Sequence, residues 1–157
     1  MAPLQFAYLL DHPDFLPIIA AWHHDEWAYI RPGDTLEARQ QRLTAECGHL
    51  EIPTTLVAMT DGKPAGSISL LAEDMDTHPE LTPWLASLYV APEMRRRGIG
   101  AALVRRLVEE ARHLGIPKLY LYTPSEEKFY AGLGWRTLEQ TTYASKPATV
   151  MWFDLSR

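Results

Sequence analysis

The sequence alternates between short blocks dense in apolar residues and longer segments in which apolar residues recur every three or four positions. Blocks of the first kind predict strands, and segments of the second kind predict helices with one apolar face. The predicted strands lie at residues 5–10, 54–60, 64–71, 84–90, 118–123, 135–142 and 149–155. The predicted helices lie at residues 13–29, 36–46, 98–114 and 126–133.

Local signals support several of these boundaries. Thr35 is a typical helix N-cap, although Ala38 stands where a complete capping box would have a glutamate. Asp61-Gly62 predicts a tight hairpin between two of the strands. The strand–helix–strand unit in the second half of the chain predicts a right-handed crossover, which makes the strands at 84–90 and 118–123 parallel neighbours.

Composition limits the class of protein without naming a function. A chain of 157 residues that is 46% hydrophobic suits one domain, residues 1–157, with an ample core. The net charge of −5 argues against a nucleic-acid partner. Cys47 is the single cysteine, so neither an internal disulfide nor a thiolate metal cluster is expected. The sequence has no apolar run of roughly 18 residues and no signal-peptide pattern, so we expect a soluble cytoplasmic protein without a membrane contact.

The strongest chemical signal is a cationic loop that contains Arg95, Arg96, Arg97, Gly98 and Gly100. This loop opens a predicted helix, where several backbone N–H groups lack partners and the helix dipole favours negative charge. The two glycines would let a ligand lie against the backbone. The sequence therefore predicts a phosphate or pyrophosphate site.

Two common nucleotide-binding motifs do not fit this loop. A P-loop needs a lysine followed by serine or threonine, and neither follows here. A dinucleotide fingerprint needs a small residue where Leu103 stands. It also needs a carboxylate farther on, where the sequence reads Tyr120-Leu-Tyr-Thr.

The pattern that does fit is Arg-x-x-Gly-x-Gly, Arg95 to Gly100, which resembles the acyl-CoA pyrophosphate loop of the GNAT family of N-acetyltransferases. Downstream, Phe129-Tyr130-Ala-Gly-Leu-Gly-Trp135 is similar to that family's Phe-Tyr-x-x-x-Gly-aromatic segment. The resemblance runs over about residues 54–152. It implies a three-layer α+β fold with a mixed, mostly antiparallel sheet of about six or seven strands and about four flanking helices. It also implies a parallel pair of strands that splays apart to admit the pantetheine arm.

The resemblance implies acetyl-CoA as co-substrate and suggests which residues hold it. Main-chain groups of the central strand would run along the pantetheine, and a backbone N–H there would polarise the thioester carbonyl. The loop would bind the pyrophosphate. Thr123 stands where many family members have asparagine, which weakens its supposed contact to the cofactor arm. The implied cofactor contacts are Leu88, Tyr89, Val90, Arg95, Arg96, Arg97, Gly98, Ile99, Gly100, Ala101, Thr123 and Phe129.

The implied reaction is direct attack of a primary amine on the thioester within a ternary complex. Tyr130 matches the family's general acid beside the thioester sulfur. A free phenol titrates near ~10 and a thiol near ~8.5, so complete proton transfer is uphill by about 2 kcal/mol and Tyr130 would act mainly as a hydrogen-bond donor.

The general base is open, because the predicted central strand carries no carboxylate. We take Glu26 of the first helix as the first candidate. Asp74, Asp76, His78, Glu80 or a chain of water molecules are alternatives. A metal is not expected, because consecutive residues in the His23–Glu26 run of a helix point about 100° apart and cannot converge on one ion.

The acceptor pocket is predicted only by residue type. Trp22, Trp27, Trp84 and Tyr122 would wall it, or would serve equally well as core residues. Aromatic walls and nearby carboxylates suit a cationic small-molecule amine, while a peptide amino group is a second possibility. Three arginines near the first helices would instead suit an acidic acceptor: Arg31, Arg39 and Arg42.

Two further alternatives concern the protein as a whole. A non-catalytic acyl-CoA sensor would keep the cofactor cleft without the strand carboxylate. A homodimer, through the C-terminal strands or the first helices, is an alternative to a monomer because members of the resembled family often pair.

Overall fold

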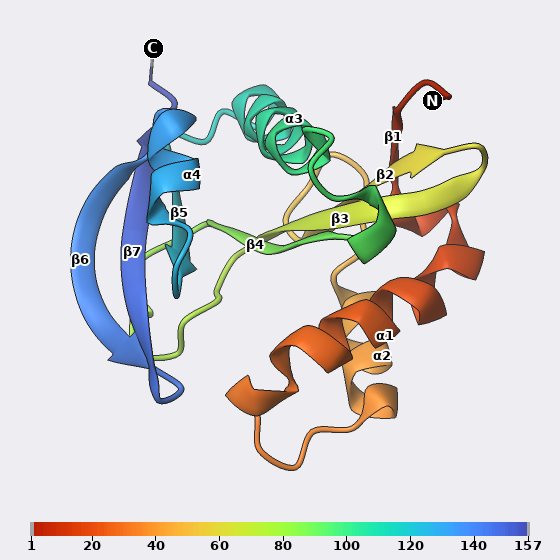
Figure 1. Cartoon of the computed structure of the whole chain (residues 1–157). Coiled ribbons are helices and arrows are strands. Elements are labelled where there is room, and N and C mark those ends of the chain that lie inside the picture. Colours follow the sequence, from red (N-terminus) through yellow and green to blue (C-terminus); the bar gives the residue numbers. More distant parts are fainter. Residues whose placement is uncertain (1, 157) are drawn as a thin grey trace.

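A single seven-stranded sheet forms the centre of the protein, in a computed structural model that describes residues 2–156. Its strands are β1 (Gln5–Tyr8), β2 (Thr54–Thr60), β3 (Lys63–Leu71), β4 (Trp84–Val90), β5 (Lys118–Thr123), β6 (Arg136–Tyr143) and β7 (Lys146–Asp154). Their order is β1-β2-β3-β4-β5-β7-β6 (Figure 1). Neighbouring strands run antiparallel except β4 and β5, which are parallel.

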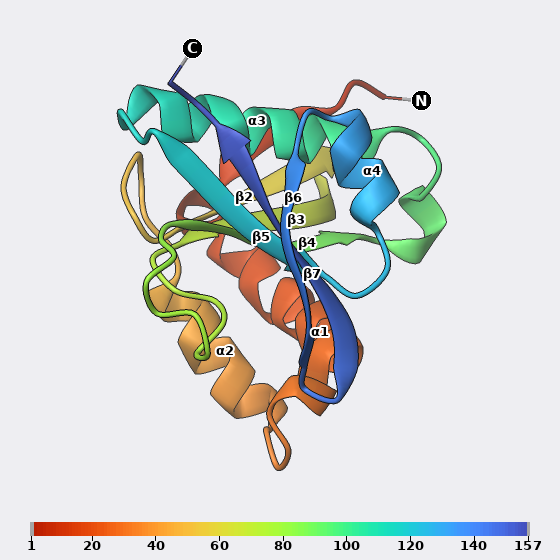
Figure 2. The ribbon, with the colours of Figure 1, turned by 90° about the vertical axis from the view of Figure 1, so that its left-hand side faces the viewer.

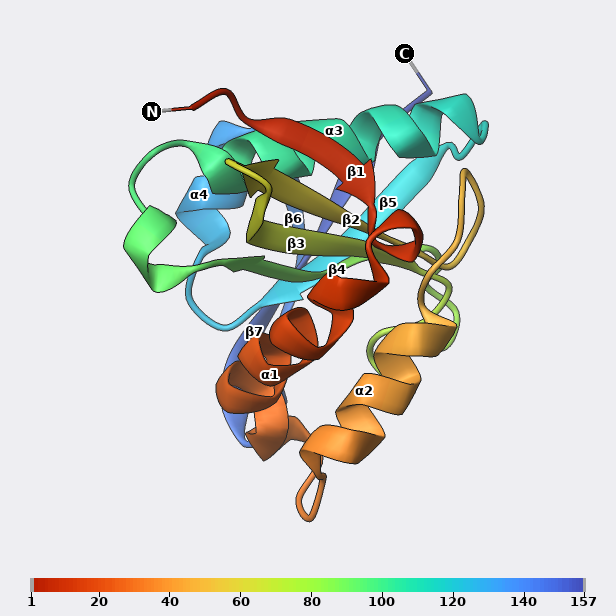
Figure 3. The ribbon, with the colours of Figure 1, turned by 90° about the vertical axis from the view of Figure 1, so that its right-hand side faces the viewer.

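Helices cover both faces of this sheet. The helix α3 (Ile99–His113) and the short α4 (Glu127–Gly132) lie on one face, and α1 (Leu16–Trp27) and α2 (Leu36–Ala45) lie on the other (Figures 2 and 3). The predicted three-layer fold with a mixed sheet is therefore confirmed. Within residues 2–156, no helix has both the length and the apolar composition that crossing a membrane requires. Short 3-10 turns complete the elements: η1 (Leu9–Asp11), η2 (Pro13–Phe15), η3 (Ala28–Ile30) and η4 (Pro92–Met94).

Alternation along the strands divides the core into two layers. Leu56 and Ala58 of β2 belong to the large cluster under α3, whereas Val57 between them packs with the cluster of α1 and α2. Successive side chains of a strand point to opposite faces, so one strand serves both layers. Ser67 and Ser69 interrupt the apolar pattern of β3 and are fully buried.

Most predicted boundaries agree with the structure, and three need correction. The first strand ends at Tyr8, where η1 begins, instead of at residue 10. The predicted helix at residues 13–29 consists of the 3-10 turn η2, the helix α1 and the 3-10 turn η3. The last strand begins at Lys146 instead of 149, because Ala144 and Ser145 form a two-residue turn with φ of 50° and 66°. Neither residue is a usual hairpin signal.

The expected turn and cap are present. Asp61 and Gly62 have φ of 53° and 71°, as a tight hairpin turn of this kind requires. The Thr35 hydroxyl oxygen accepts a hydrogen bond from the Ala38 N–H at 3.1 Å and caps α2. Both features agree with the sequence prediction.

The parallel strands β4 and β5 separate soon after they meet. Their only register position within the described residues is Trp84 opposite Tyr120. One further bond, from the Tyr120 N–H to the Pro83 carbonyl at 3.1 Å, lies at the same end. The other strand pairs have longer ladders, so the sheet opens between β4 and β5 toward the end of β4. This opening is the splay that the resemblance implied.

Close packing of β3 against β4 predicts the effect of one substitution. A Cβ at Gly66 would lie 2.7 Å from the Tyr89 carbonyl oxygen and 3.0 Å from Cδ1 of Leu103. We expect Gly66→Ala to lower the free energy of unfolding by about 1–3 kcal/mol in urea denaturation, because strand and helix must move apart. Gly132→Ala is the control, since a Cβ there meets nothing within 4 Å and alanine favours the helix. Equal stability of Gly66→Ala and wild type would contradict this packing.

Candidate active site

A β-bulge lies in β4 where that strand leaves β5. Ser67 pairs with Tyr89 and Ser69 pairs with Ala86, so the register shifts by one residue between them. Ser87 takes up the extra residue with φ of 56°, a left-handed conformation that is uncommon for residues other than glycine. Bulges of this kind redirect the backbone and are frequent beside active sites.

A chain of hydrogen bonds holds the bulge from the opposite layer. Arg39 Nη2 donates to Glu46 Oε1 at 3.0 Å and to His23 Nδ1 at 2.9 Å. Because a guanidinium can only donate, the proton of the neutral imidazole is on Nε2 and is donated to Ser67 Oγ at 2.8 Å. The Ser67 hydroxyl then donates to the Ser87 carbonyl oxygen at 3.3 Å.

This chain fixes the direction of one peptide group. The Ser87 carbonyl and the Leu88 N–H belong to the same planar trans peptide and point in opposite directions. The carbonyl is held toward β3, so the Leu88 N–H is directed to the side of β5. The β4–β5 ladder has already ended at Trp84 and Tyr120 among the described residues, so the N–H faces the opening between the two strands.

His23 stays neutral in this environment. Burial lowers the pKa of His23 to about 3, and the positive charge of Arg39 acts in the same direction. At neutral pH the imidazole therefore keeps one acceptor and one donor nitrogen. The hydrogen bonds that hold the Ser87 carbonyl are then the same throughout the physiological pH range.

The predicted phosphate loop forms the beginning of α3. Gly98 has φ of 78°, and the first intrahelical bond runs from the Ala102 N–H to the Gly98 carbonyl at 3.1 Å. The N–H groups of Ile99, Gly100 and Ala101 come before that bond and lie in the first helical turn. They are donors of the kind that bind phosphate at a helix N-terminus.

The three arginines of the loop differ in their surroundings. Arg95 Nε donates to the Val90 carbonyl at 2.9 Å, and its guanidinium carbon lies 5.3 Å from the centroid of the Tyr89 ring. Arg95 therefore holds the loop against β4. Arg96 and Arg97 are exposed, and Arg96 has φ of 65°.

The two family-like segments lie next to each other. A methyl group on Gly100 would lie 3.7 Å from Cζ of Phe129 and 3.8 Å from Cγ2 of Val90. The start of α3, the end of β4 and helix α4 thus enclose one region. Thr123 is buried, and its hydroxyl oxygen accepts the Glu126 N–H at 3.0 Å, so it orients the start of α4.

Tyr130 lies in α4 among other aromatic rings. Its ring makes edge contacts with Phe129 and Trp135, at centroid distances of 5.0 and 6.2 Å. Burial raises the pKa of Tyr130, and the Glu126 carboxylate raises it further. The phenol therefore stays protonated at neutral pH and can act as a donor.

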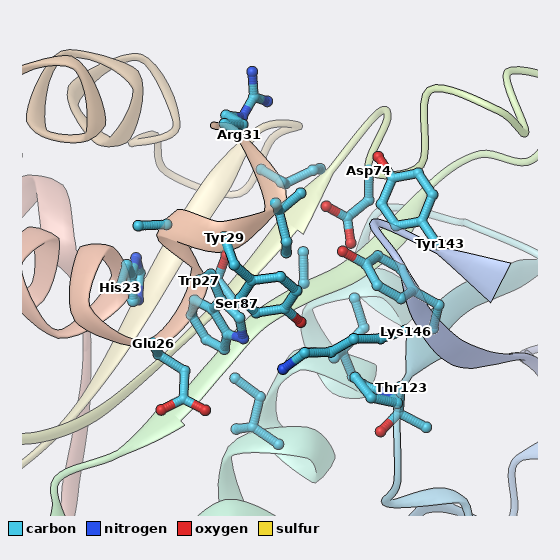
Figure 4. A pocket seen from close by; sticks show the side chains of 18 of the residues that line it. His23, Glu26, Trp27, Tyr29, Arg31, Asp74, Ser87, Thr123, Tyr143 and Lys146 are labelled. Carbon is cyan, nitrogen blue, oxygen red and sulfur yellow. The ribbon is translucent and has the colours of Figure 1, made fainter. Parts of the chain in front are cut away.

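A cavity of about 600 Å³ lies between β4, β5, the α1–α2 segment, the β3–β4 loop and the β6–β7 turn. Figure 4 shows the labelled side chains of Glu26, Trp27 and Thr123 around it. The predicted site residues that line it are Glu26, Trp27, Leu88, Tyr122, Thr123 and Tyr130.

The other predicted acceptor residues lie elsewhere. Trp22 stacks on Tyr89 at a centroid distance of 5.4 Å and does not line the cavity. Trp84 is fully buried, and its Nε1 donates to the Leu81 carbonyl at 2.7 Å. The remaining predicted cofactor residues lie along β4, at the start of α3 and in α4.

Of the alternative bases, Asp74 and Asp76 line the cavity, while His78 and Glu80 do not. Asp76 accepts a hydrogen bond from the Tyr143 hydroxyl at 3.3 Å. His78 Nε2 is hydrogen-bonded to Glu139 at 2.6 Å. Among the residues that the structure describes, Asp74 has no such hydrogen-bond partner. Among residues 2–156, no three histidine, cysteine, aspartate or glutamate side chains form a metal-binding group.

Sequence reasoning did not single out Tyr29 or Lys146, which also line the cavity. The Lys146 ammonium lies 3.9 Å from the centroid of the Tyr29 ring, so these two residues connect the β6–β7 turn with η3. Nothing in their sequence spacing brings them together. Only the paired β6 and β7 strands carry Lys146 to this position.

Comparison with known proteins agrees with this geometry. The model of the acetyltransferase (GNAT) family matches residues 16–135. No curated protein matches the sequence.

Solved structures share the fold at low identity. An aminoglycoside 6′-N-acetyltransferase complexed with coenzyme A is 16% identical, with a TM-score of 0.73 over 96% of this chain and 97% of that one. The protein yncA from Salmonella typhimurium, solved with its cofactor acetyl-CoA, is 19% identical, with a TM-score of 0.71 over 98% and 93%. A ribosomal-protein alanine N-acetyltransferase from Escherichia coli is 21% identical, with a TM-score of 0.69 over 99% and 96%.

The neutral state of His23 predicts a pH-dependent stability. Its folded pKa of about 3 lies below the ordinary 6.5, so the unfolded chain binds more protons between these values. The stability that His23 contributes is present above pH 6.5 and is lost as pH falls toward 3. We expect the difference in unfolding free energy between wild type and His23→Gln to shrink by about 1.4 kcal/mol per pH unit.

Urea denaturation of both proteins between neutral and mildly acidic pH measures this difference. Asp74 has a raised pKa and gives the opposite slope, but it is present in both proteins and cancels. A difference that does not change with pH would mean that His23 is not held neutral.

Proposed function

The chain belongs to the acetyltransferase (GNAT) family, and we propose that it transfers the acetyl group of acetyl-CoA to a primary amine of a small molecule or a peptide. The opening between β4 and β5 is the observation that carries this proposal. It lies between a loop suited to phosphate and a cavity large enough for an acceptor. A thioester that lies in this opening would be within reach of the loop on one side of the sheet and of the cavity on the other.

The loop at the start of α3 suits the pyrophosphate of acetyl-CoA. The N–H groups of Ile99, Gly100 and Ala101 would bind its oxygens, with the positive charge of Arg96 and Arg97 nearby. The pantetheine would follow the main chain of Leu88, Tyr89 and Val90 through the opening. Phe129 would cover it from α4, and Arg95 would keep the loop in place.

The Leu88 N–H suits the developing oxyanion. Attack by a neutral amine forms the C–N bond and moves the carbonyl electron pair onto oxygen. A donor already directed at that oxygen lowers the barrier by about 3–4 kcal/mol. The Ser87 carbonyl anchored by Ser67 keeps this donor in position.

Tyr130 and Glu26 are proposed for the proton transfers. When the C–S bond breaks, its electron pair leaves with the sulfur, which takes the phenolic proton of Tyr130 or a hydrogen bond from it. Glu26 is exposed at the end of α1 and lines the cavity, so it can take a proton from the incoming amine directly or through water.

Thiol release from acetyl-CoA tests the transfer. The assay uses a panel of small amines, amino acids and peptides with free N-termini, each beside an enzyme-free control. We expect one class to give release and an acetylated product by mass spectrometry. Tight binding of acetyl-CoA with no release for any acceptor would favour an acyl-CoA sensor, and absence of acetyl-CoA binding would refute the proposal.

Replacing Tyr130 separates its chemical role from packing. We expect Tyr130→Phe to lower kcat about 10²-fold while the Kd of acetyl-CoA stays within about twofold, because only the donor is lost. Tyr120→Phe is the matched control, since Tyr120 lies on β5 outside the cavity. An unchanged kcat in Tyr130→Phe would remove Tyr130 from the mechanism.

The exposed arginines of the loop are predicted to attract the anionic cofactor. We expect the double variant Arg96→Gln/Arg97→Gln to raise the Kd of coenzyme A about tenfold in calorimetry at low salt, with a smaller effect at high salt. Arg105→Gln on the exposed side of α3 is the control. If both variants bind coenzyme A as wild type does, the loop is not the phosphate site.

A further inference from the structure

Asp74 is a half-buried carboxylate of the cavity wall, and no hydrogen bond or ion pair joins it to another side chain among residues 2–156. Figure 4 shows the side chain directed into the cavity. An ionised carboxylate without a partner is costly in such a place, so a ligand cation would satisfy it.

Two of the cavity's arginines are already engaged. Arg42 makes two hydrogen bonds to the Asp34 carboxylate, at 2.9 and 2.7 Å. Arg39 is paired with Glu46 at 3.0 Å. Both guanidinium charges are therefore already balanced by carboxylates, although the Nε of each has no hydrogen-bond partner among the described residues. Of the three arginines considered for an acidic acceptor, only the exposed Arg31 is without a carboxylate partner among residues 2–156.

The remaining charges of the cavity are mainly negative. Besides the two ion pairs, the wall has two cations, Arg31 and Lys146, and both are exposed. The carboxylates outside those pairs outnumber them and are those of Glu26, Glu73, Asp74, Asp76 and Glu126. A cavity of this charge concentrates cationic molecules and repels anionic ones.

Two tyrosine rings, those of Tyr122 and Tyr143, lie near Asp74. Tyr122 and Tyr143 pack edge to face at a centroid distance of 5.2 Å. Burial raises the pKa of Tyr122, and the Asp74 carboxylate raises it further, so the two side chains are near each other. The ammonium of Lys146 over the Tyr29 ring shows that a tyrosine wall of this cavity accommodates a cation.

Asp74 lies apart from Glu26, the proposed base. In Figure 4, Asp74 and Tyr143 lie toward one end of the cavity, and Glu26 and Thr123 toward the other. The volume of about 600 Å³ is in the range of pockets that enclose drug-sized ligands. A single small amine would leave one of the two ends empty.

We propose that Asp74 selects the acceptor by binding a second cationic group of an organic di- or polyamine, while the reacting amine lies near Leu88. The selection rests on the proposed acetyl transfer, but the binding itself does not require turnover. Asp74 takes no part in bond making, and the proton of the reacting amine still goes to Glu26 or water.

The charge state of Asp74 gives this binding a characteristic pH dependence. Burial raises the pKa of Asp74 to about 7, and Glu46 adds to the rise, while Arg39 and Arg31 oppose it. Below that pH the empty site is neutral and must lose a proton before it pairs with an ammonium. Affinity for a diamine therefore falls as pH drops below 7. The groups facing Asp74 are Arg31, Arg39 and Glu46 from the α1–α2 segment and Tyr122 and Tyr143 from the sheet.

Calorimetry with a series of linear diamines, each compared with the monoamine of the same length, tests the proposal in the presence of coenzyme A. We expect the best diamine to bind wild type about 10- to 100-fold more tightly than its monoamine at pH 8. Asp74→Asn, which keeps the shape and removes the charge, should abolish this preference and its pH dependence. Glu73→Gln, an exposed carboxylate of the same wall, is the matched control and should keep both.

Steady-state kinetics on the same pairs then separates this proposal from the proposed function. We expect Asp74→Asn to raise KM for the diamine by a similar factor, with kcat within about twofold, since the chemical step does not use Asp74. Equal binding of diamine and monoamine by wild type, or an unchanged preference in Asp74→Asn, would overturn the role of Asp74. If the diamine binds in a way that depends on Asp74 but no thiol is released, the proposed acetyl transfer is contradicted and the proposed role of Asp74 in binding is not.

Discussion

The separation of β4 from β5 is the constraint on which the rest of the structure depends. A parallel pair that paired along its whole length would leave no path through the sheet and would satisfy the backbone groups of β4 on both sides. The bulge at Ser87 lies just beyond the last paired position and turns one peptide group into the gap. The helices α3 and α4 lie on one side of this opening, and α1 and α2 lie on the other (Figures 2 and 3).

Each side of the opening has a different kind of chemistry, because the two layers present different groups. On the α3 side, backbone N–H groups and exposed arginines favour phosphate. On the α1–α2 side, carboxylates and tyrosines line a cavity that favours cations. An anionic donor and a cationic acceptor would therefore approach from opposite sides and meet at the sheet. The net charge of −5 is a sum over the whole protein, so it does not show that the two sides of the sheet differ in charge.

The sequence predicted the elements well because their signals are local. Apolar spacing, the Asp61-Gly62 turn and the Thr35 cap each depend on a few adjacent residues. The Ala144-Ser145 turn was missed because it lacks the residues that usually adopt its backbone. The loop at the start of α3 was predicted from one continuous stretch, whereas the cavity was not. Tyr29, Asp74 and Lys146 come from separate segments, and only the folded sheet brings them together.

The hydrogen-bond chain from Glu46 through Arg39, His23 and Ser67 makes the molecule less modular than its layers suggest. The helices that wall the cavity also hold the strand peptide that faces the opening. An exchange of the α1–α2 segment for one with different acceptor contacts would therefore need to keep Arg39 and His23 in place. Only the wall positions outside this hydrogen-bond chain could then change without disturbing the strand peptide.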